Sequence, residues 1–187
     1  PKGRYTYPMD AGWRVERPQD IEKIRVLGSG GALKLELQMH KVIETWNPAN
    51  GFDHVAFVIF LQLPDQPGGT KEMPLQNSRL PDAMRWHYRL RSHGWSNALF
   101  SHEAASATSE GTPVAPAATI ETDKQRNTVT FTLPAKSLGS LKDLSGMKIH
   151  VTTWDYDGGF RKLAADAQTS VYGGGDGTKD PLVMDEV

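Results

Sequence analysis

The chain has 187 residues, a formal net charge of −1, no cysteine, 18 glycines and 12 prolines. This length suits one well-buried core. Because the charge is near zero and the Lys and Arg residues are scattered, we expect no binding to nucleic acid. The lack of cysteine excludes a disulfide framework, a thiolate metal site and a cysteine nucleophile. The longest apolar run, 54–63, is well short of the roughly 20 residues that a membrane helix needs, so we expect no membrane span.

In chain order, the first half predicts strands separated by turns. Residues 1–18 are rich in aromatic residues and prolines, which suggests a loop with a first edge strand. Residues 20–27 predict a strand that ends in a hairpin turn at 28–31, and 32–42 alternate cleanly between apolar and polar residues. Residues 55–63 form a near-continuous apolar run, which is typical of a central strand buried on both faces.

The second half continues this pattern, with one short helical turn predicted within 136–144. Its predicted strands are 84–90, 95–101, 118–122, 128–133 and the first half of 147–161. About eight to ten short strands with almost no helix predict an all-β fold, an antiparallel, jelly-roll-like β-sandwich with long loops. No boundary divides the chain, so we predict a single domain over residues 1–187.

The stretch 147–161 carries the most chemistry, because a strand pattern there ends in aromatic residues interleaved with acids. Trp154 and Tyr156 lie two positions apart, on one face of a strand, and Asp155 and Asp157 lie on the other. Sugar rings stack on aromatic faces and need polar groups beside them, so these residues are a candidate carbohydrate site. The alternative is core packing, since aromatic side chains bury well.

Trp86 and Trp95, with Tyr88 between them, form a second candidate aromatic cluster. For Trp86 the core is the favoured place. A paired-carboxylate glycosidase is not favoured, although Asp155 and Asp157 would lie about 7 Å apart along a strand. Nothing in the sequence builds a substrate cleft around them.

Acidic residues near the C-terminus suggest a calcium site, because Ca²⁺ takes carboxylate and backbone oxygens in flexible loops. We name Asp157, Asp176 and Asp180 as candidate ligands, the last two in the glycine-rich stretch 173–180. The spacing is not that of an EF-hand, and a solvated turn is the alternative. The six histidines show no HxH or HExxH pattern, so zinc is not predicted.

Three motifs together point to a known family. They are Gly3-Arg4-Tyr5-Thr6-Tyr7-Pro8, Trp154-Asp155-Tyr156-Asp157-Gly158-Gly159-Phe160-Arg161, and Gly173-Gly174-Gly175-Asp176 followed by Asp180-Pro181-Leu182-Val183-Met184-Asp185. They resemble the C-terminal, surface-layer-homology-like module of glucodextranases. Similar modules follow the catalytic domains of amylopullulanases and some bacterial α-amylases. The resemblance covers nearly the whole chain and is strongest at its two ends.

The resemblance implies a β-sandwich related to DOMON and family 9-like carbohydrate-binding folds. It implies a non-catalytic accessory module of an exported glycoside hydrolase that degrades α-glucans, either periplasmic or secreted. The partners would be an α-glucan or an envelope polysaccharide, and a catalytic domain upstream. Relatives carry an acidic segment before the Tyr-x-Tyr-Pro entry that this chain lacks, as expected of a C-terminal fragment of a larger enzyme.

We therefore expect a glycan to be held mainly by Trp154 and Tyr156, with Asp155, Trp95 and Trp86 as further candidates. Two alternatives stay open. The module is a structural element that packs on its own catalytic domain and stabilises it, or it is a DOMON-type haem binder, for which no spacing supplies a ligand pair.

Overall fold

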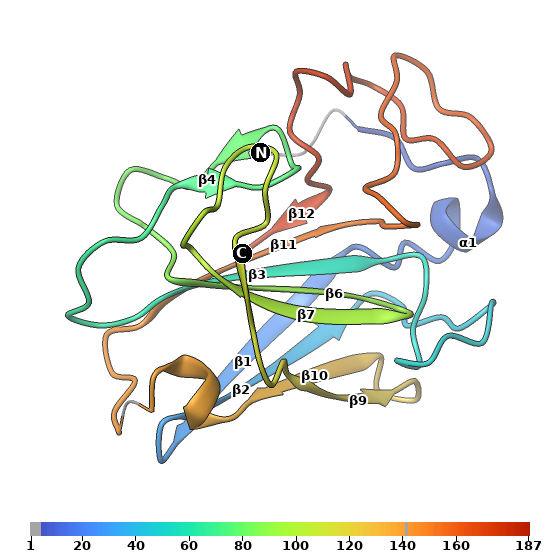
Figure 1. The fold of residues 1–187 in the computed structure, drawn as a ribbon. Helices are drawn as coiled ribbons and strands as arrows, with labels where there is room; N and C mark the ends of the chain where they lie inside the picture. Colours follow the sequence, from blue (N-terminus) through green and yellow to red (C-terminus); the bar gives the residue numbers. More distant parts are fainter. Residues whose placement is uncertain (1–4, 141) are drawn as a thin grey trace.

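The computed structural model describes residues 5–140 and 142–187, so Gly3 and Arg4 of the N-terminal motif lie outside the described part. Two antiparallel sheets face each other as a β-sandwich, which confirms the predicted fold class (Figure 1). The first sheet has the strand order β1 (Ile21–Ser29), β2 (Ala32–Met39), β10 (Thr128–Leu133), β9 (Thr119–Asp123). The second has the order β12 (Asp185–Glu186), β11 (Lys148–Trp154), β3 (Ala56–Gln62), β6 (Tyr88–His93), β7 (Ser96–Ser101), β8 (Thr112–Val114).

The strand β3 is buried on both faces, as its continuous apolar sequence predicts. Phe57, Ile59 and Leu61 point into the main core between the two sheets. Val58 and Phe60 point the other way, into a second apolar cluster. Successive side chains of a strand alternate between faces, so a strand that is apolar at every position needs cover on both sides.

That cover is a layer of long loops on the outer face of the six-stranded sheet (Figure 1). It includes the small hairpin of β4 (Glu72–Met73) and β5 (Ser78–Arg79) and the segments at both ends of the chain. The second cluster contains Trp86, and a third contains Trp13 and Trp154. The loops therefore carry apolar cores of their own.

The N-terminal segment differs from its prediction. Residues 11–14 form one helical turn, α1 (Ala11–Arg14), with the Asp10 side chain accepting from the Gly12 N–H at its start. Within the described residues, its bridge pairing is an isolated one between Thr6 and Gly173 of the C-terminal loops, and not with a named strand. No edge strand forms there in the described residues, because the aromatic side chains dock instead on the outer loops.

The strand predicted at 84–90 lies later, at β6. Trp86 pairs only with Thr70 in an isolated bridge and turns its ring into the second cluster. The turn predicted at 92–94 is correspondingly shorter, since β6 continues through His93. The helical turn predicted within 136–144 is a 3-10 helix, η1 (Ala135–Leu138). Within the described residues, no helix has the length and apolar character needed to cross a membrane.

Candidate functional site

The candidate site lies at the end of the sandwich where β3 and β7 begin and β6 and β11 end. Ala56 pairs with both His93 and Trp154, which places the three strand ends side by side. The loop 40–55, the turn between β6 and β7, and the turn 155–161 all leave the sheets at this end, on the right in Figure 1. Loops that extend from the end of a rigid sandwich are common places for binding residues.

Two tryptophan rings are exposed at this end. Trp46 keeps 46% of its surface exposed and Trp95 keeps 52%. Their ring centroids lie 6.2 Å apart with an angle of 27° between the planes. They are therefore a pair of nearly parallel, solvent-facing aromatic plates.

A buried pair of residues, Asp53 and His54, contacts Trp46 and fixes its position. The Trp46 N–H donates to Asp53 Oδ2 at 2.6 Å, and His54 Nδ1 lies 2.6 Å from Asp53 Oδ1. The His54 ring stacks on Trp46 with centroids 3.9 Å apart. His54 has a φ of +61°, a backbone conformation that costs free energy in a non-glycine residue and concentrates at functional sites.

A second buried acid, Asp155, contacts the N-terminal segment and two residues of its own turn. Asp155 accepts hydrogen bonds from Trp13 Nε1 at 3.0 Å and from the Tyr156 N–H at 2.7 Å, and it pairs with Arg161. The Arg161 guanidinium also lies over the rings of Trp13 and Trp46, 4.8 and 5.8 Å from their centroids. Burial raises the pKa of Asp155, and the charge of Arg161 opposes this rise.

The turn after β11 adds a third aromatic ring and an exposed acid. The Tyr156 ring stacks on His93 at 4.5 Å, and the Arg91 guanidinium lies over it at 4.5 Å. Burial, and then the charge of Arg91, lower the pKa of His93 to about 4, so this ring is neutral near pH 7. The side chain of Asp157 is 75% exposed.

These residues line a hollow of about 200 Å³. Its lining combines aromatic faces, carboxylate oxygens and the backbone of the β6–β7 turn. The residues are Trp46, Asp53, His54, Val55, Gly94, Trp95, Asp155, Tyr156 and Asp157. Apolar faces beside a few polar groups are typical of small-molecule binding sites.

The predicted site residues divide into two groups. Trp95, Tyr156, Asp155 and Asp157 meet at the hollow. Trp154 and Trp86 do not, because both are fully buried. A ligand cannot stack on a ring whose faces are already covered, so the prediction that these two rings contact a glycan is wrong.

The two buried tryptophans have structural roles that explain their position. Trp154 stacks on Tyr172 with centroids 4.1 Å apart and donates from Nε1 to the Arg161 carbonyl at 2.9 Å. Trp86 packs near Phe60 and donates to the Glu72 carbonyl at 2.6 Å. Asp155 is also buried, so it holds Trp13 and Arg161 in position and is not free to bind the hydroxyl groups of a sugar.

The three candidate calcium ligands do not form one group. Among the described residues, no set of three acidic or histidine side chains lies close enough to hold a metal ion. Asp176 and Asp180 meet in a turn, where Asp180 Oδ2 accepts the Asp176 N–H at 2.8 Å, whereas Asp157 lines the aromatic hollow. Calcium binding therefore stays a prediction from the sequence.

Sequence reasoning missed Trp46, Asp53 and His54. Trp46 lies in the stretch 44–52, whose Asn, Pro and Gly content is typical of a loop, and Asp53 and His54 follow it directly. The available signal was a tryptophan inside a polar loop, a context that favours an exposed ring over a core position. The pairing with Trp95, 49 positions away in the sequence, has no local signature.

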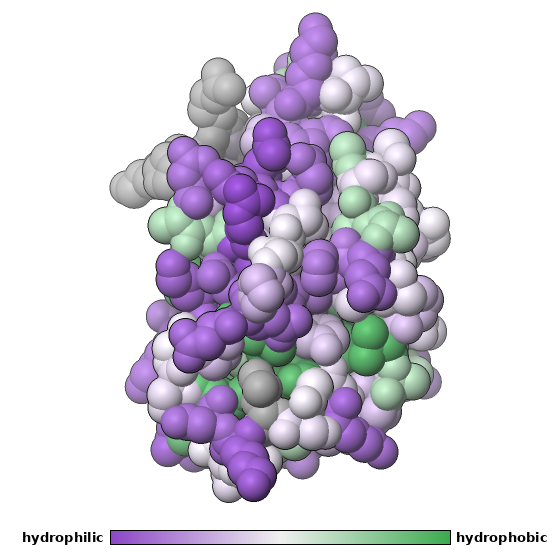
Figure 2. All heavy atoms as spheres, turned by 60° about the vertical axis from the view of Figure 1, so that its left-hand side comes forward, coloured by the Kyte–Doolittle hydropathy of each residue, from purple (hydrophilic) through white to green (hydrophobic). Residues whose placement is uncertain are grey.

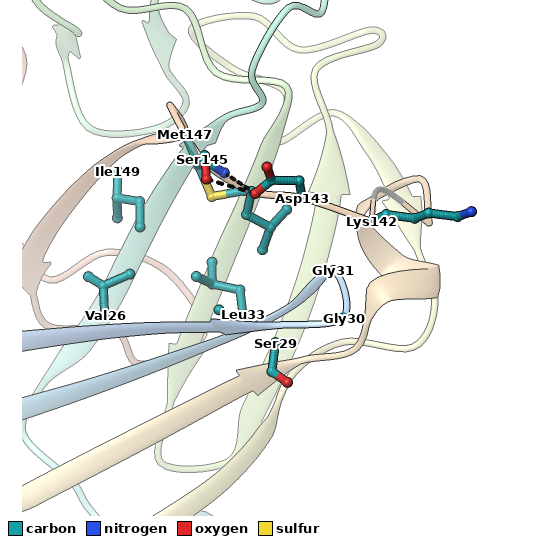
Figure 3. Close-up of a pocket in the computed structure, with 12 residues that line it drawn as sticks. Val26, Ser29, Gly30, Gly31, Leu33, Lys142, Asp143, Ser145, Met147 and Ile149 are labelled. Carbon is teal, nitrogen blue, oxygen red and sulfur yellow. Dashed lines mark hydrogen bonds between the residues drawn. The ribbon is translucent and has the colours of Figure 1, made fainter.

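A second hollow, of about 340 Å³, lies at the opposite end of the sandwich (Figure 3). Val26, Leu33, Met147 and Ile149 give it apolar walls, between the β1–β2 turn and the loop before β11. Figure 2 shows hydrophobic residues gathered low on this side of the molecule, within a largely hydrophilic surface. This hollow has no aromatic ring in its described lining, so it does not present plates for a sugar.

The fold and the hollow together define an all-β module that presents an aromatic surface at one end. A family model matches residues 2–187, and its description is the C-terminal binding module, SLH-like, of glucodextranase. The chain belongs to this family, which confirms the resemblance drawn from the sequence. No match to the chain was found among curated proteins. The family is one of binding modules, which supports an accessory binding role and not catalysis.

Proposed function

We propose that this chain is a carbohydrate-binding accessory module of an exported α-glucan-degrading enzyme. One observation carries the proposal: the nearly parallel, exposed pair of Trp46 and Trp95 at the rim of an acid-lined hollow. Single exposed apolar residues are ordinary, whereas neighbouring exposed rings form an apolar patch, and such patches mark binding surfaces. A sugar ring offers the matching C–H face, and the exposed Asp157 carboxylate beside the two rings would accept hydrogen bonds from its hydroxyl groups.

The ligand would come either from the substrate or from the cell envelope. Both are polysaccharides and both offer the same ring faces and hydroxyl groups. The name of the family, an SLH-like module of glucodextranase, is compatible with either source and with a secreted or cell-surface enzyme. The module would hold the catalytic domain, upstream in the same protein, close to the polymer.

Affinity electrophoresis tests the proposal and separates the two sources. The module is run through gels that contain amylopectin, dextran or pullulan, and is mixed in parallel with insoluble cell-wall material. We expect retardation in at least one gel or retention on the wall. Trp95→Ala and Trp46→Ala should remove it, since each variant deletes one of the two exposed rings on which the sugar would stack.

Val26→Ala is the matched control, because Val26 is 49% exposed and lies in β1 at the opposite hollow. This variant should migrate like the unchanged module. Free migration of the unchanged module in all three gels, with no retention on cell-wall material, would overturn the proposal. Retention that survives both tryptophan variants would place the ligand elsewhere on the module.

A second candidate function is the stabilisation of the catalytic domain by direct packing. The observation that favours it is the apolar hollow at the opposite end of the sandwich, where Val26 leaves 49% of its surface open to solvent beside Met147 and Ile149. In this case truncation of the module should lower the melting temperature of the remaining enzyme. Val26→Asp in the whole enzyme should reproduce that loss without changing retention by a polysaccharide.

A further inference from the structure

The exposed charge of the aromatic hollow is negative. Three of its lining residues are acids, Asp53, Asp155 and Asp157, and none is a lysine or an arginine. Two guanidinium groups lie behind the lining. Arg161 pairs with Asp155 and has 12% of its side chain exposed, and Arg91 lies over the Tyr156 ring with 8% exposed. A ligand in the hollow would thus meet the Asp157 carboxylate and the indole rings, without an exposed cation among the lining residues.

The three carboxylates differ in their pairing partners and in their exposure to solvent. Asp53 is paired with the His54 ring at 2.6 Å and is fully buried. Asp155 takes the Nε of Arg161, the Trp13 indole N–H and a backbone N–H. Asp157 meets only the far edge of the same guanidinium, at 3.4 Å, and is 75% exposed. The charge that a ligand faces is therefore mainly that of Asp157.

We propose, as a step that rests on the proposed function, that this hollow accepts neutral or cationic polysaccharides and rejects anionic ones. Asp157 is the residue that sets this selection. A carboxylate, sulfate or phosphate group on the ligand would lie against the Asp157 carboxylate, and like charges placed together at an interface are costly. The negative faces of the Trp46 and Trp95 rings act in the same direction, since aromatic faces attract cations and not anions.

A matched series of ligands with one backbone tests the inference. The ligands are dextran, carboxymethyl-dextran and diethylaminoethyl-dextran, or the same derivatives of pullulan if dextran is not bound. Binding is followed by tryptophan fluorescence and by titration calorimetry at pH 7, at low salt and at physiological salt. We expect carboxymethyl-dextran to bind at least about tenfold more weakly than dextran at low salt, and diethylaminoethyl-dextran to bind at least as well as dextran.

Asp157→Asn should narrow the ratio between the affinities for dextran and carboxymethyl-dextran, because it removes the like-charge contact; this ratio is the measured quantity, since any loss of hydrogen bonds to hydroxyl groups affects both ligands. Added salt should narrow the same ratio in the unchanged module, because exposed charges are screened over about 8 Å at physiological salt. Asp65→Asn is the control: Asp65 is exposed, lies beyond the other end of β3, and has a φ of +51° that asparagine tolerates.

The outcomes separate this inference from the function on which it rests. Binding of dextran and carboxymethyl-dextran with equal affinity, unchanged in Asp157→Asn, would overturn the selection and leave the glycan-binding function intact. Stronger binding of the carboxymethyl ligand would overturn it as well. Absence of binding to every member of the dextran and pullulan series and to amylopectin and cell-wall material would overturn the proposed function, and the selection with it.

Discussion

The indole N–H of Trp13 donates a hydrogen bond to Asp155 Oδ2 at 3.0 Å, across 142 positions of the sequence. Trp13 belongs to the short helix α1, and Asp155 follows the last residue of β11. The contact therefore fixes the N-terminal segment to the end of the six-stranded sheet, directly behind the aromatic hollow. Both side chains are buried, so the bond contributes to the position of the surface without touching a ligand.

We expect Asp155→Asn to destabilise the module by about 3 kcal/mol, because it leaves the buried Arg161 guanidinium without its main counter-charge. Asparagine keeps an oxygen acceptor for Trp13, so the loss should come mainly from the charge. Urea unfolding followed by tryptophan fluorescence measures it. Asp157→Asn, at a side chain that is 75% exposed, should change the free energy of unfolding by less than about 0.5 kcal/mol. Equal losses in the two variants would contradict this role of Asp155.

The contrast between these two acids illustrates what the sequence could predict. Periodicity over a few residues is a local property, so it predicted the paired strands β1 and β2, the buried strand β3 and the β9–β10 hairpin. Exposure is not local. Trp154 ends a strand beside acids and glycines, as a binding residue would, but the C-terminal loops fold over it and bury it fully.

The pairing of Trp46 with Trp95 could not be predicted from the sequence for the same reason. Trp46 and Trp95 lie in different loops and come together only because the ends of β3 and β6 are neighbours in the sheet. The support by Asp53 and His54 depends on a positive φ at His54, which no sequence pattern marks. Motifs at the two ends of the chain identified the family, whereas the middle of the chain supplies the exposed surface.

Replacing Trp154 and Trp95 should therefore give opposite results. Trp154→Ala removes a fully buried ring, and we expect a loss of about 3–5 kcal/mol in the free energy of unfolding. Trp95→Ala removes a half-exposed ring, so stability should change by less than about 1 kcal/mol while glycan retention is lost. Urea unfolding and affinity electrophoresis on the same two variants test the pair. A stable Trp154→Ala that has lost glycan binding would return the site to Trp154.

The stability of the module should fall on mild acidification. Burial, and then Arg91, lower the pKa of His93 from 6.5 to about 4. Between these two values the unfolded chain binds more protons than the folded one, so stability rises with pH across this window and is lost as the pH falls. Between pH 6.5 and pH 4 we expect His93 to account for a loss of about 1–2 kcal/mol in the free energy of unfolding.

The difference between the unchanged module and His93→Asn isolates this contribution, measured by urea unfolding at several pH values. His87 and His150 also have lowered pKa values and act in the same direction, so the variant keeps part of the slope. If His93→Asn shows the same loss between pH 6.5 and pH 4 as the unchanged module, folding does not lower the pKa of His93.

The spacing of the two aromatic plates depends on Gly94, the residue before Trp95 in the β6–β7 turn. A Cβ at Gly94 would lie 2.7 Å from the Phe52 carbonyl oxygen and 2.8 Å from Pro48 Cβ. Both neighbours belong to the loop that carries Trp46, and the carbonyl is backbone, so the loop itself must move to make room. We expect Gly94→Ala to cost about 1–3 kcal/mol in unfolding free energy and to weaken glycan binding by separating Trp46 from Trp95.

Gly28→Ala is the matched control, because a Cβ there meets nothing within 4 Å. Urea unfolding of both variants measures the effect on stability, and calorimetric titration with the glycan measures the effect on binding. Unchanged binding in Gly94→Ala would show that the ligand does not need the present spacing of the two rings.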